Sequence, residues 1–241
     1  MTLLVESLEL SLSNRTIVKN VNLNVHPGEV VGLLGPNGAG KTSTFNMIVG
    51  LIKPNQGNIY LEGNSINKFS MTKRVKLGIG YLAQEPSIFK NLTVIENLDI
   101  ALSQNNWSRS LCRKKRQELI EEFNLLSFLD RYGHQLSGGE RRRCEVARAL
   151  AVGPLGPKYL LLDEPFAGID PIAINDLQSL IRKLKNKNIG ILITDHNVRA
   201  TLAITSRAYI LNQGEILAYG SSDQLTKNQV VKDHYLGNSF D

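Results

Sequence analysis

The segment that most constrains this chain is a glycine-rich stretch, Gly35-Pro36-Asn37-Gly38-Ala39-Gly40-Lys41-Thr42. It has the spacing G-x-x-x-x-G-K-[ST], which is informative when a strand precedes it and a helix follows it. Here residues 30–34 form an apolar, strand-like run, and residues 42–49 have a helical pattern that ends at Gly50. A purely structural glycine-rich turn is the alternative, but the flanking strand and helix favour a loop that binds phosphate.

The residue types of this loop suit a nucleotide with several phosphates. The glycines let backbone N–H groups turn inward around phosphate oxygens, and the N-terminus of the following helix adds a favourable dipole. Lys41 would neutralise the terminal phosphates, and the Thr42 hydroxyl can ligate Mg²⁺. The predicted nucleotide-binding residues are Gly35, Pro36, Asn37, Gly38, Ala39, Gly40, Lys41, Thr42 and Ser43.

A second segment, Leu160-Leu161-Leu162-Asp163-Glu164, is an apolar strand that ends in two carboxylates. Parallel sheets present ligand-binding groups at the carboxyl edge, so Asp163 would face the Mg²⁺ shell and Glu164 could polarise an attacking water. An acidic turn before Pro165 is the alternative when the segment is taken alone. Together with the phosphate loop, the segment indicates nucleotide hydrolysis.

A third segment, Ser137-Gly138-Gly139-Glu140, precedes a helical pattern. Ser137 can cap that helix, and the two glycines leave backbone N–H groups exposed at its start. A plain capping box of Ser137 and Glu140 explains the same residues. One phosphate loop and a separate phosphate-seeking helix in one chain suggest that two chains share nucleotides.

The order of the elements predicts an α/β fold with a mainly parallel sheet. Residues 3–25 alternate like antiparallel strands, and short strands are expected at 57–62 and 78–83, separated by polar turns. Residues from about 93 to 130 are mainly helical, with Leu119, Phe123 and Leu126 at helical spacing. The last third alternates strand and helix and ends in a hairpin through Asn212-Gln213-Gly214-Glu215, which implies a parallel sheet covered by helices. The inward face of the early strands is expected to contain Val18, Val21, Leu23 and Val25.

Length, composition and charge argue against several other classes of protein. The chain has 241 residues, of which 42% are hydrophobic, so it suits one α/β domain with a full core. No run approaches the roughly 18 apolar residues of a membrane-spanning helix, and residues 1–10 do not resemble a secretory signal. Cys112 and Cys144 are expected to be reduced thiols. The net charge is +6, but the basic clusters at 113–116 and 141–143 lack interleaved aromatics, so no nucleic acid partner is expected.

Leu136-Ser137-Gly138-Gly139-Glu140, just upstream of residues 159–165, resembles the signature motif of ABC ATPases. The other marks of that family follow in order: Gln84 resembles the Q-loop, Ala167-Gly168-Ile169-Asp170 the D-loop, and His196 the switch histidine. The resemblance covers essentially the whole chain. It implies a P-loop ATPase of the ABC type, a single domain over 1–241 in which 1–92 and 131–241 form the core and about 93–130 a helical subdomain.

The resemblance also implies roles for single residues. Two copies would pack head to tail around two ATP molecules, with Ser137, Gly138 and Gly139 acting on the nucleotide of the other copy. Glu164 would be the general base, His196 would contact the γ-phosphate, Gln84 would touch Mg²⁺, and Asp170 would cross the interface between copies. The implied catalytic residues are thus Glu164, His196, Lys41 and Gln84, and the implied metal ligands are Thr42, Gln84 and Asp163.

Within the family, four segments are similar to the ATPases of lipopolysaccharide exporters: residues 81–89, 137–143, 163–171 and 194–199. The resemblance implies transport of lipopolysaccharide or another lipid by separate membrane subunits, with this chain on the cytoplasmic face of an inner membrane. Frequent Asn, Ile and Lys leave open a plastid genome, for which the location would be stromal. Ile88 and Phe89 are expected to be exposed and to receive the membrane partner, with packing beneath their loop as the alternative.

Two departures from the family pattern stand out. Leu12 occupies the position where ABC ATPases usually place an aromatic residue against adenine, and Gly153-Pro154-Leu155-Gly156-Pro157 makes a longer loop than the exporter pattern. Two other functions remain open. One is the ATPase of a branched-chain amino-acid importer, and the other is a soluble ABC protein that binds nucleic acid or a scaffold.

Overall fold

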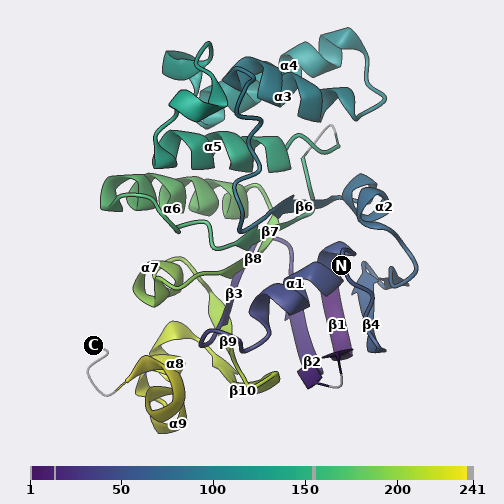
Figure 1. The fold of residues 1–241 in the computed structure, drawn as a ribbon, viewed down its shortest axis with the longest axis vertical. Helices are drawn as coiled ribbons and strands as arrows, with labels where there is room; N and C mark the ends of the chain where they lie inside the picture. The colour runs from purple at the N-terminus through teal and green to yellow at the C-terminus, as the bar shows by residue number, and fades with distance from the viewer. Residues whose placement is uncertain (1, 14, 154–155, 238–241) are drawn as a thin grey trace.

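The computed structural model describes residues 2–13, 15–153 and 156–237, and it contains two β-sheets with helices packed around them (Figure 1). The larger sheet has six strands in the order β10-β9-β3-β8-β7-β6. Its neighbours β9/β3, β3/β8, β8/β7 and β7/β6 are parallel, and only β10 joins it antiparallel. The strands are β3 (Val30–Leu34), β6 (Ile79–Leu82), β7 (Tyr159–Asp163), β8 (Gly190–Thr194), β9 (Arg207–Asn212) and β10 (Glu215–Gly220).

The central strands are apolar because helices cover both faces of the sheet. Every residue of β3, β7 and β8 is buried, as expected for a parallel sheet between two helical layers. The covering helices include α1 (Lys41–Val49), α5 (Gly138–Ala149), α6 (Pro171–Asn186) and α7 (Val198–Leu202). The predicted α/β fold with a mainly parallel core sheet is therefore confirmed.

The N-terminal part forms the second sheet, in the order β2-β1-β4-β5, and its pairings are antiparallel. Its strands are β1 (Leu3–Leu12), β2 (Arg15–Val25), β4 (Gln56–Leu61) and β5 (Asn64–Ser65). Val18, Val21, Leu23 and Val25 are all buried, as predicted. The three-residue step from Val18 to Val21 would break strict alternation, but Asn20 has φ +47° at a register shift and returns the later residues to the inner face.

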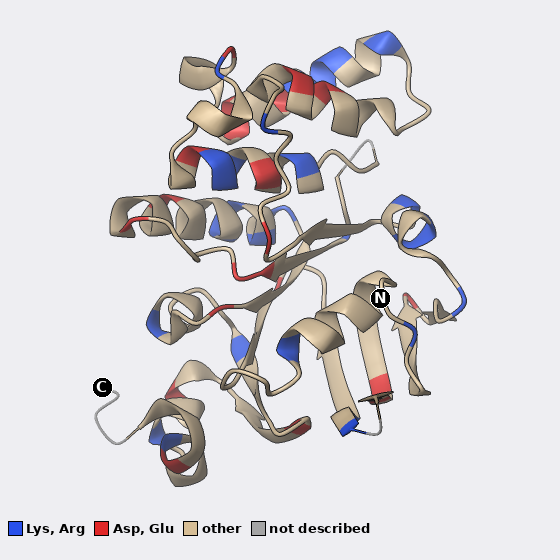
Figure 2. Cartoon of the chain, viewed as in Figure 1, with Lys and Arg blue, Asp and Glu red and all other residues tan. Residues whose placement is uncertain are grey.

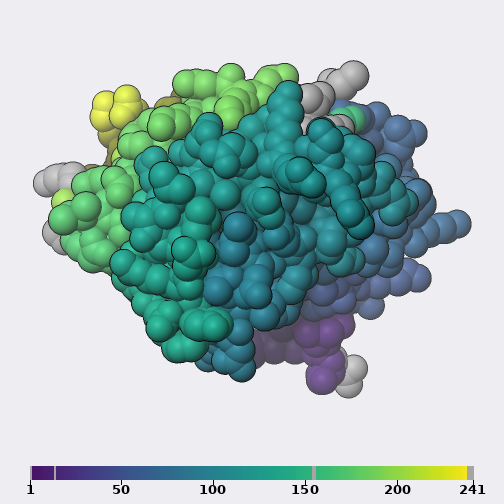
Figure 3. All heavy atoms as spheres, turned by 90° about the horizontal axis from the view of Figure 1, so that it is seen from above, coloured from purple at the N-terminus to yellow at the C-terminus, as the bar shows by residue number. Residues whose placement is uncertain are grey.

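The helical segment lies at one end of the molecule. It contains α3 (Val94–Ser103), α4 (Arg109–Glu122) and a short 3-10 turn (Leu126–Phe128), and seen from above these elements and α5 cover the centre of the molecular surface (Figure 3). Leu119 and Phe123 are buried there, but Leu126 is 74% exposed, so the three residues at helical spacing do not share one buried face. The helix ends at Glu122 and Asn124 has φ +49°, which breaks the helical spacing before Leu126.

Several elements were missed by the sequence patterns. The region between β4 and β6 contains α2 (Met71–Lys76) where only polar turns were expected. This helix is short and strongly basic, so it has no apolar periodicity, although Ser70 caps its N-terminus by accepting a hydrogen bond from the Lys73 N–H. The predicted hairpin β9/β10 is present but does not close the fold, because α8 (Ser222–Lys227), α9 (Gln229–Val231) and a π-helical turn (Lys232–Leu236) follow it.

Charged residues lie mainly on the helices and at strand ends (Figure 2). Lysine and arginine are distributed over several helices, among them α2, α4, α5 and α7, rather than along one strand face. Cys112 and Cys144, on α4 and α5, are free thiols, as predicted. Within the described ranges, no helix combines the length and the hydropathy required to cross a membrane.

Arg74 is an exception to the rule that the core is apolar. Its side chain is 1% exposed, and it donates hydrogen bonds to the carbonyl oxygens of Met47 and Ile48, each at 2.7 Å, and of Phe69 at 3.0 Å. Met47 and Ile48 lie in the last turn of α1, where helix carbonyls lack intrahelical partners and where a cation is favourable. Arg74 therefore fixes the C-terminal end of the helix whose N-terminal end follows the glycine-rich loop.

Replacing Arg74 by Met should lower the free energy of unfolding by about 3 kcal/mol, because several buried carbonyl oxygens would lose their donor. Urea denaturation followed by circular dichroism measures this change. The matched control is Lys76→Met, an exposed position on the same helix, which should change stability by less than about 0.5 kcal/mol. Equal stability of both variants would show that Arg74 does not hold α1 in place.

Candidate functional site

The glycine-rich loop connects β3 to α1, and its conformation depends on glycine. Gly38 and Gly40 have φ values of +76° and +104°, a region that side chains with a Cβ rarely adopt. Gly40 also occupies the N-cap of α1 without a capping side chain, so the first N–H groups of the helix are available to an anion. The helix begins at Lys41, one residue earlier than predicted.

Lys41 is a buried cation in this loop. Its Nζ donates hydrogen bonds to the carbonyl oxygens of Gly35 at 2.8 Å and Pro36 at 3.0 Å. Burial lowers the pKa of Lys41, and the nearby carboxylates of Glu164 and Asp163 oppose that effect. The amine thus lies between the phosphate-binding loop and the acidic end of β7.

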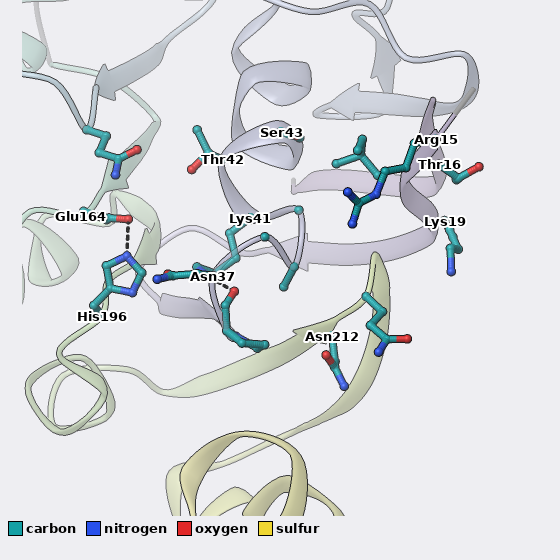
Figure 4. A pocket seen from close by; sticks show the side chains of 17 residues that line it. Arg15, Thr16, Lys19, Asn37, Lys41, Thr42, Ser43, Glu164, His196 and Asn212 are labelled. Carbon is teal, nitrogen blue, oxygen red and sulfur yellow. Dashed lines mark hydrogen bonds and ion pairs between the residues drawn. The ribbon is translucent and has the colours of Figure 1, made fainter. Parts of the chain in front are cut away.

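Topology explains why distant segments meet here. β8 pairs with both β3 and β7 in parallel, so the carboxyl ends of the three strands share one edge of the sheet. The loop before Lys41, the carboxylate of Glu164 and the ring of His196 each follow one of these strands. Figure 4 shows Glu164 and His196 on one side of a common cavity, facing Lys41.

The cavity has a volume of about 900 Å³. It brings together most of the predicted nucleotide-binding residues of the loop, from Pro36 to Ser43, with Gln84, Glu164 and His196. Its other wall comes from the N-terminal sheet and from the β9/β10 turn. The residues on that wall are Arg15, Thr16, Ile17, Lys19, Asn212 and Gln213.

Asp163 and Glu164 differ in their surroundings. Asp163 is fully buried, and neither of its carboxylate oxygens has a hydrogen-bond partner among the described residues. Burial, followed by the charge of Glu164, raises the pKa of Asp163 to about 6, against the opposing effect of Lys41. A buried carboxylate with both oxygens free of protein donors suits a bound cation.

Glu164 has a left-handed backbone conformation, with φ +51°. Its N–H donates to the carbonyl of Thr194 at 2.8 Å, and its Oε1 lies 2.8 Å from Nε2 of His196. The next turn is held by Asp195, which accepts hydrogen bonds from the N–H groups of Phe166 and Asn197. A non-glycine residue in this conformation is uncommon, and the surrounding contacts stabilise it.

The segment around Ser137 forms a separate cavity of about 220 Å³. Ser137 caps α5 through the predicted capping box with Glu140. A Cβ on Gly139 would lie 2.6 Å from the Cβ of Ala173, so glycine is also needed where α5 approaches α6. Asp170 caps α6 by accepting from the N–H groups of Ile172 and Ala173, which holds the pKa of its carboxyl below its usual range. No described residue lines both cavities, so one chain does not bring Ser137 to the glycine-rich loop.

Arg142 and Glu145 were missed as functional residues because the sequence shows only a basic cluster at 141–143. Arg142 is 5% exposed and donates to the carbonyl oxygens of Glu164 and Pro165 and to that of Ala83, just before Gln84. It also forms an ion pair of 3.0 Å with Glu145, whose other oxygen accepts from the N–H groups of Ser87 and Ile88. The sequence signal that could have identified this pair is the i, i+3 spacing of opposite charges on a predicted helix.

Of the two apolar residues Ile88 and Phe89 in the loop after Gln84, the structure exposes Phe89 and buries Ile88. Ile88 is 6% exposed and packs in the core, so its expected exposure is wrong: the hydrogen bond from its N–H to Glu145 fixes it facing inward. Phe89 is 43% exposed, with the guanidinium of Arg148 stacked 4.7 Å from its ring centre. Phe89 therefore presents an exposed apolar surface on the loop that follows the cavity residue Gln84.

The sequence departs from the family pattern at Leu12 and at the loop 153–157, and the structure describes the first of these completely and the second only in part. Leu12 is 49% exposed and does not line the cavity. The long loop at 153–157 includes Pro154 and Leu155, which lie outside the described residues.

Taken together, the parallel sheet, the phosphate-binding loop and the carboxylates at the next strand end define a P-loop nucleotide-binding protein. A model of the ABC transporter family matches residues 18–167. The chain belongs to the ABC transporter ATP-binding family and is an ATPase.

Curated relatives align along almost the whole chain. The lipopolysaccharide export system ATP-binding protein LptB of Haemophilus influenzae is 50% identical over 236 residues, which cover 98% of this chain and 97% of that protein. The protein with the same description from Escherichia coli K12 is 46% identical over 240 residues, covering 99% and 98%. These relatives are bacterial and give no support to a plastid origin.

Solved structures agree with the fold. The ADP conformation of MJ1267, an ATP-binding cassette of an ABC transporter, superposes with a TM-score of 0.87 at 28% identity and covers 98% of this chain and 99% of that one. A dimeric post-hydrolysis state of the cassette MJ0796, bound to ADP and phosphate, superposes with a TM-score of 0.79 at 27% identity, covering 92% and 98%. ABC ATPases form such dimers and pair with membrane permease subunits.

Replacing Arg142 by Lys should lower the kcat for ATP hydrolysis by on the order of tenfold to a hundredfold, because a single ammonium cannot hold the carbonyl groups on both sides of the Glu164 turn. The KM for ATP should stay within about twofold, since Arg142 does not line the cavity that contains the glycine-rich loop. Steady-state hydrolysis measures both values. Arg113→Lys on the exposed face of α4 is the control, and an unchanged kcat for Arg142→Lys would contradict this positioning role.

Proposed function

We propose that this chain is the ATPase subunit of an exporter of lipopolysaccharide or a related lipid. The observation that carries the proposal is the 50% and 46% identity to two export ATPases over nearly their full lengths. The chain would act at the cytoplasmic face of an inner membrane, bound to separate membrane subunits. A core of 1–92 and 131–241 with a helical subdomain at about 93–130 is the division that we propose for the single ATPase domain.

Two copies would enclose two ATP molecules head to tail. The separation of the Ser137 cavity from the glycine-rich loop supports this arrangement, because each cavity offers only part of a triphosphate site. Ile172 supports it too: this residue lines the Ser137 cavity, follows Asp170 closely and is 75% exposed. An exposed apolar side chain beside an anion-binding helix start suits a contact between copies. Ser137, Gly138 and Gly139 would then bind the γ-phosphate held by the other copy.

Hydrolysis would follow from the groups that line the larger cavity. Glu164 would take a proton from the attacking water. The water oxygen would form a bond to the γ-phosphorus while the bond between that phosphorus and the β,γ-bridging oxygen breaks. Lys41 and His196 would stabilise the negative charge on the γ-phosphate oxygens. Asp170 would contribute from the interface between the copies.

Mg²⁺ fits the residues at the phosphate end. The hydroxyl of Thr42, the amide oxygen of Gln84 and the buried carboxylate of Asp163 are hard oxygen donors, and both oxygens of Asp163 have no partner in the described part of the chain. Bound there, Mg²⁺ would supply charge neutralisation to the β- and γ-phosphates. Gln84 would link this site to the loop that carries Phe89.

Phe89 is the proposed contact for the membrane subunits. It is exposed, stacks against Arg148 and lies five residues after Gln84, so a docked helix could sense the nucleotide site through this loop. The N–H groups of Ser87 and Ile88 donate to Glu145 on α5, which would connect the loop to the helix that Ser137 caps.

Replacing Phe89 by Ala should reduce lipid transport by the assembled complex at least about tenfold, because an aromatic anchor of the docking surface would be lost. Hydrolysis by the free subunit should remain within about twofold of the unmodified protein. Phe69→Ala is a matched control, since Phe69 is 37% exposed and also carries a nearby cation, Lys73. Equal loss of transport and of free-subunit hydrolysis in Phe89→Ala would contradict a docking role for Phe89.

The cargo and partners are tested by capture from native membranes. Tagged protein carrying Glu164→Gln should stay in the closed, ATP-bound dimer when ATP and Mg²⁺ are present, because the proposed base is lost while the nucleotide site is kept. Mass spectrometry should identify multispanning proteins of a lipid exporter. Recovery of an importer with a periplasmic binding protein would indicate that the cargo is an amino acid and not a lipid. Recovery of only soluble or nucleic-acid-bound partners would contradict the transport function.

A further inference from the structure

The end of the large cavity that faces away from the carboxylates has an unusual lining. A nucleotide with its phosphates on the glycine-rich loop must place its base toward the wall formed by the N-terminal sheet and the β9/β10 turn, because Glu164 and His196 occupy the opposite side (Figure 4). No phenylalanine, tyrosine or tryptophan among the described residues lines the cavity. On this wall, the described residues therefore offer the base no phenylalanine, tyrosine or tryptophan to stack on.

This wall is fixed relative to the glycine-rich loop. The N–H of Lys19 donates to the carbonyl of Gly214 at 2.8 Å, and the N–H of Gly214 donates to the carbonyl of Ala39 at 3.1 Å. The strand β2, the β9/β10 turn and the phosphate-binding loop are thus joined by backbone hydrogen bonds. Side chains on β2 are held at a constant position relative to a bound phosphate.

Two cations of β2 line the cavity, and they differ in their partners. Lys19 forms an ion pair of 3.4 Å with Glu215. The side chain of Arg15 makes no hydrogen bond or ion pair within the described residues, and it extends from β2 into the cavity (Figure 4). Arg15 is the cross-strand neighbour of Leu12, whose exposed side chain shares the same face of the hairpin. The guanidinium is therefore a flat group that is free to meet a ligand.

We infer that Arg15 provides the stacking surface for the nucleotide base. A guanidinium is planar, delocalised and weakly hydrated, so it stacks on aromatic rings in a way that a lysine ammonium cannot. Stacking of this kind uses the face of the base and not its edge, so Arg15 supports adenine and guanine alike. The inference rests on the nucleotide-binding role proposed for the cavity.

The competing contact for an unpaired cation in this cavity is a phosphate of the nucleotide. The two contacts differ in what they require of the ligand. Base stacking needs a nucleobase, whereas a phosphate contact is preserved in a ligand that has only phosphates. They also differ in what they require of residue 15, because a lysine keeps the charge but has no planar group.

The experiment compares binding of ATP, GTP and inorganic tripolyphosphate, each with Mg²⁺, by isothermal titration calorimetry. Arg15→Ala and Arg15→Lys should each weaken ATP and GTP binding by about tenfold and leave tripolyphosphate binding within about twofold. Adding Leu12→Tyr to Arg15→Ala should restore most of the lost ATP affinity, because a tyrosine on the same face offers a new stacking surface. Lys76→Ala, which removes an exposed cation outside the cavity, should change ATP affinity by less than about twofold.

The outcomes separate the inference from the function on which it rests. Equal weakening of ATP and tripolyphosphate in Arg15→Ala, with recovery in Arg15→Lys, would overturn base stacking and assign Arg15 to a phosphate. Unchanged ATP binding in both variants would overturn it as well. Failure of the unmodified protein to bind either ATP or tripolyphosphate would instead contradict the nucleotide site itself.

Discussion

The guanidinium of Arg142 connects the three segments on which the site depends. From one buried position on α5 it donates to the backbone of Glu164 and Pro165, to the carbonyl before Gln84, and to Glu145, which in turn holds the N–H groups of Ser87 and Ile88. An arginine provides enough donors in a rigid plane to satisfy all of these groups, and a buried charge left without them would be costly. The helix that Ser137 caps is therefore joined by hydrogen bonds to the turn of Glu164 and to the loop of Phe89, so a movement of this helix would act on both.

The strand order gives this network its location. Because β8 lies between β3 and β7 in parallel register, the glycine-rich loop, His196 and Glu164 meet at one edge of the sheet. The helix α5 packs against β6, and its N-terminal end lines a separate cavity. One chain thus keeps the two cavities apart, which is the geometric reason to propose that a second copy completes the nucleotide site.

Much of this arrangement could be predicted from the sequence, because its signals are local. Three of these signals each depend on a few adjacent residues: the residue pattern of the glycine-rich loop, the apolar run before Asp163 and the capping box at Ser137. The helix α2 could not be predicted, since its basic sequence has no apolar periodicity and its one inward side chain is Arg74, a residue type usually found on the surface. Arg142 and the inward Ile88 were missed for a similar reason: their positions are decided by contacts with carbonyls and a carboxylate that lie far away in the sequence.

The most direct test of the account is whether two incomplete copies complete one another. In a Glu164→Gln background, one protein would also carry Lys41→Ala and the other Ser137→Arg, and size-exclusion chromatography would follow association with ATP and Mg²⁺. We predict that each variant alone stays monomeric and that the mixture forms dimers, because the loop of the second and the helix start of the first make one intact site. A mixture that stays monomeric, while protein with Glu164→Gln alone dimerises, would contradict a site shared between copies.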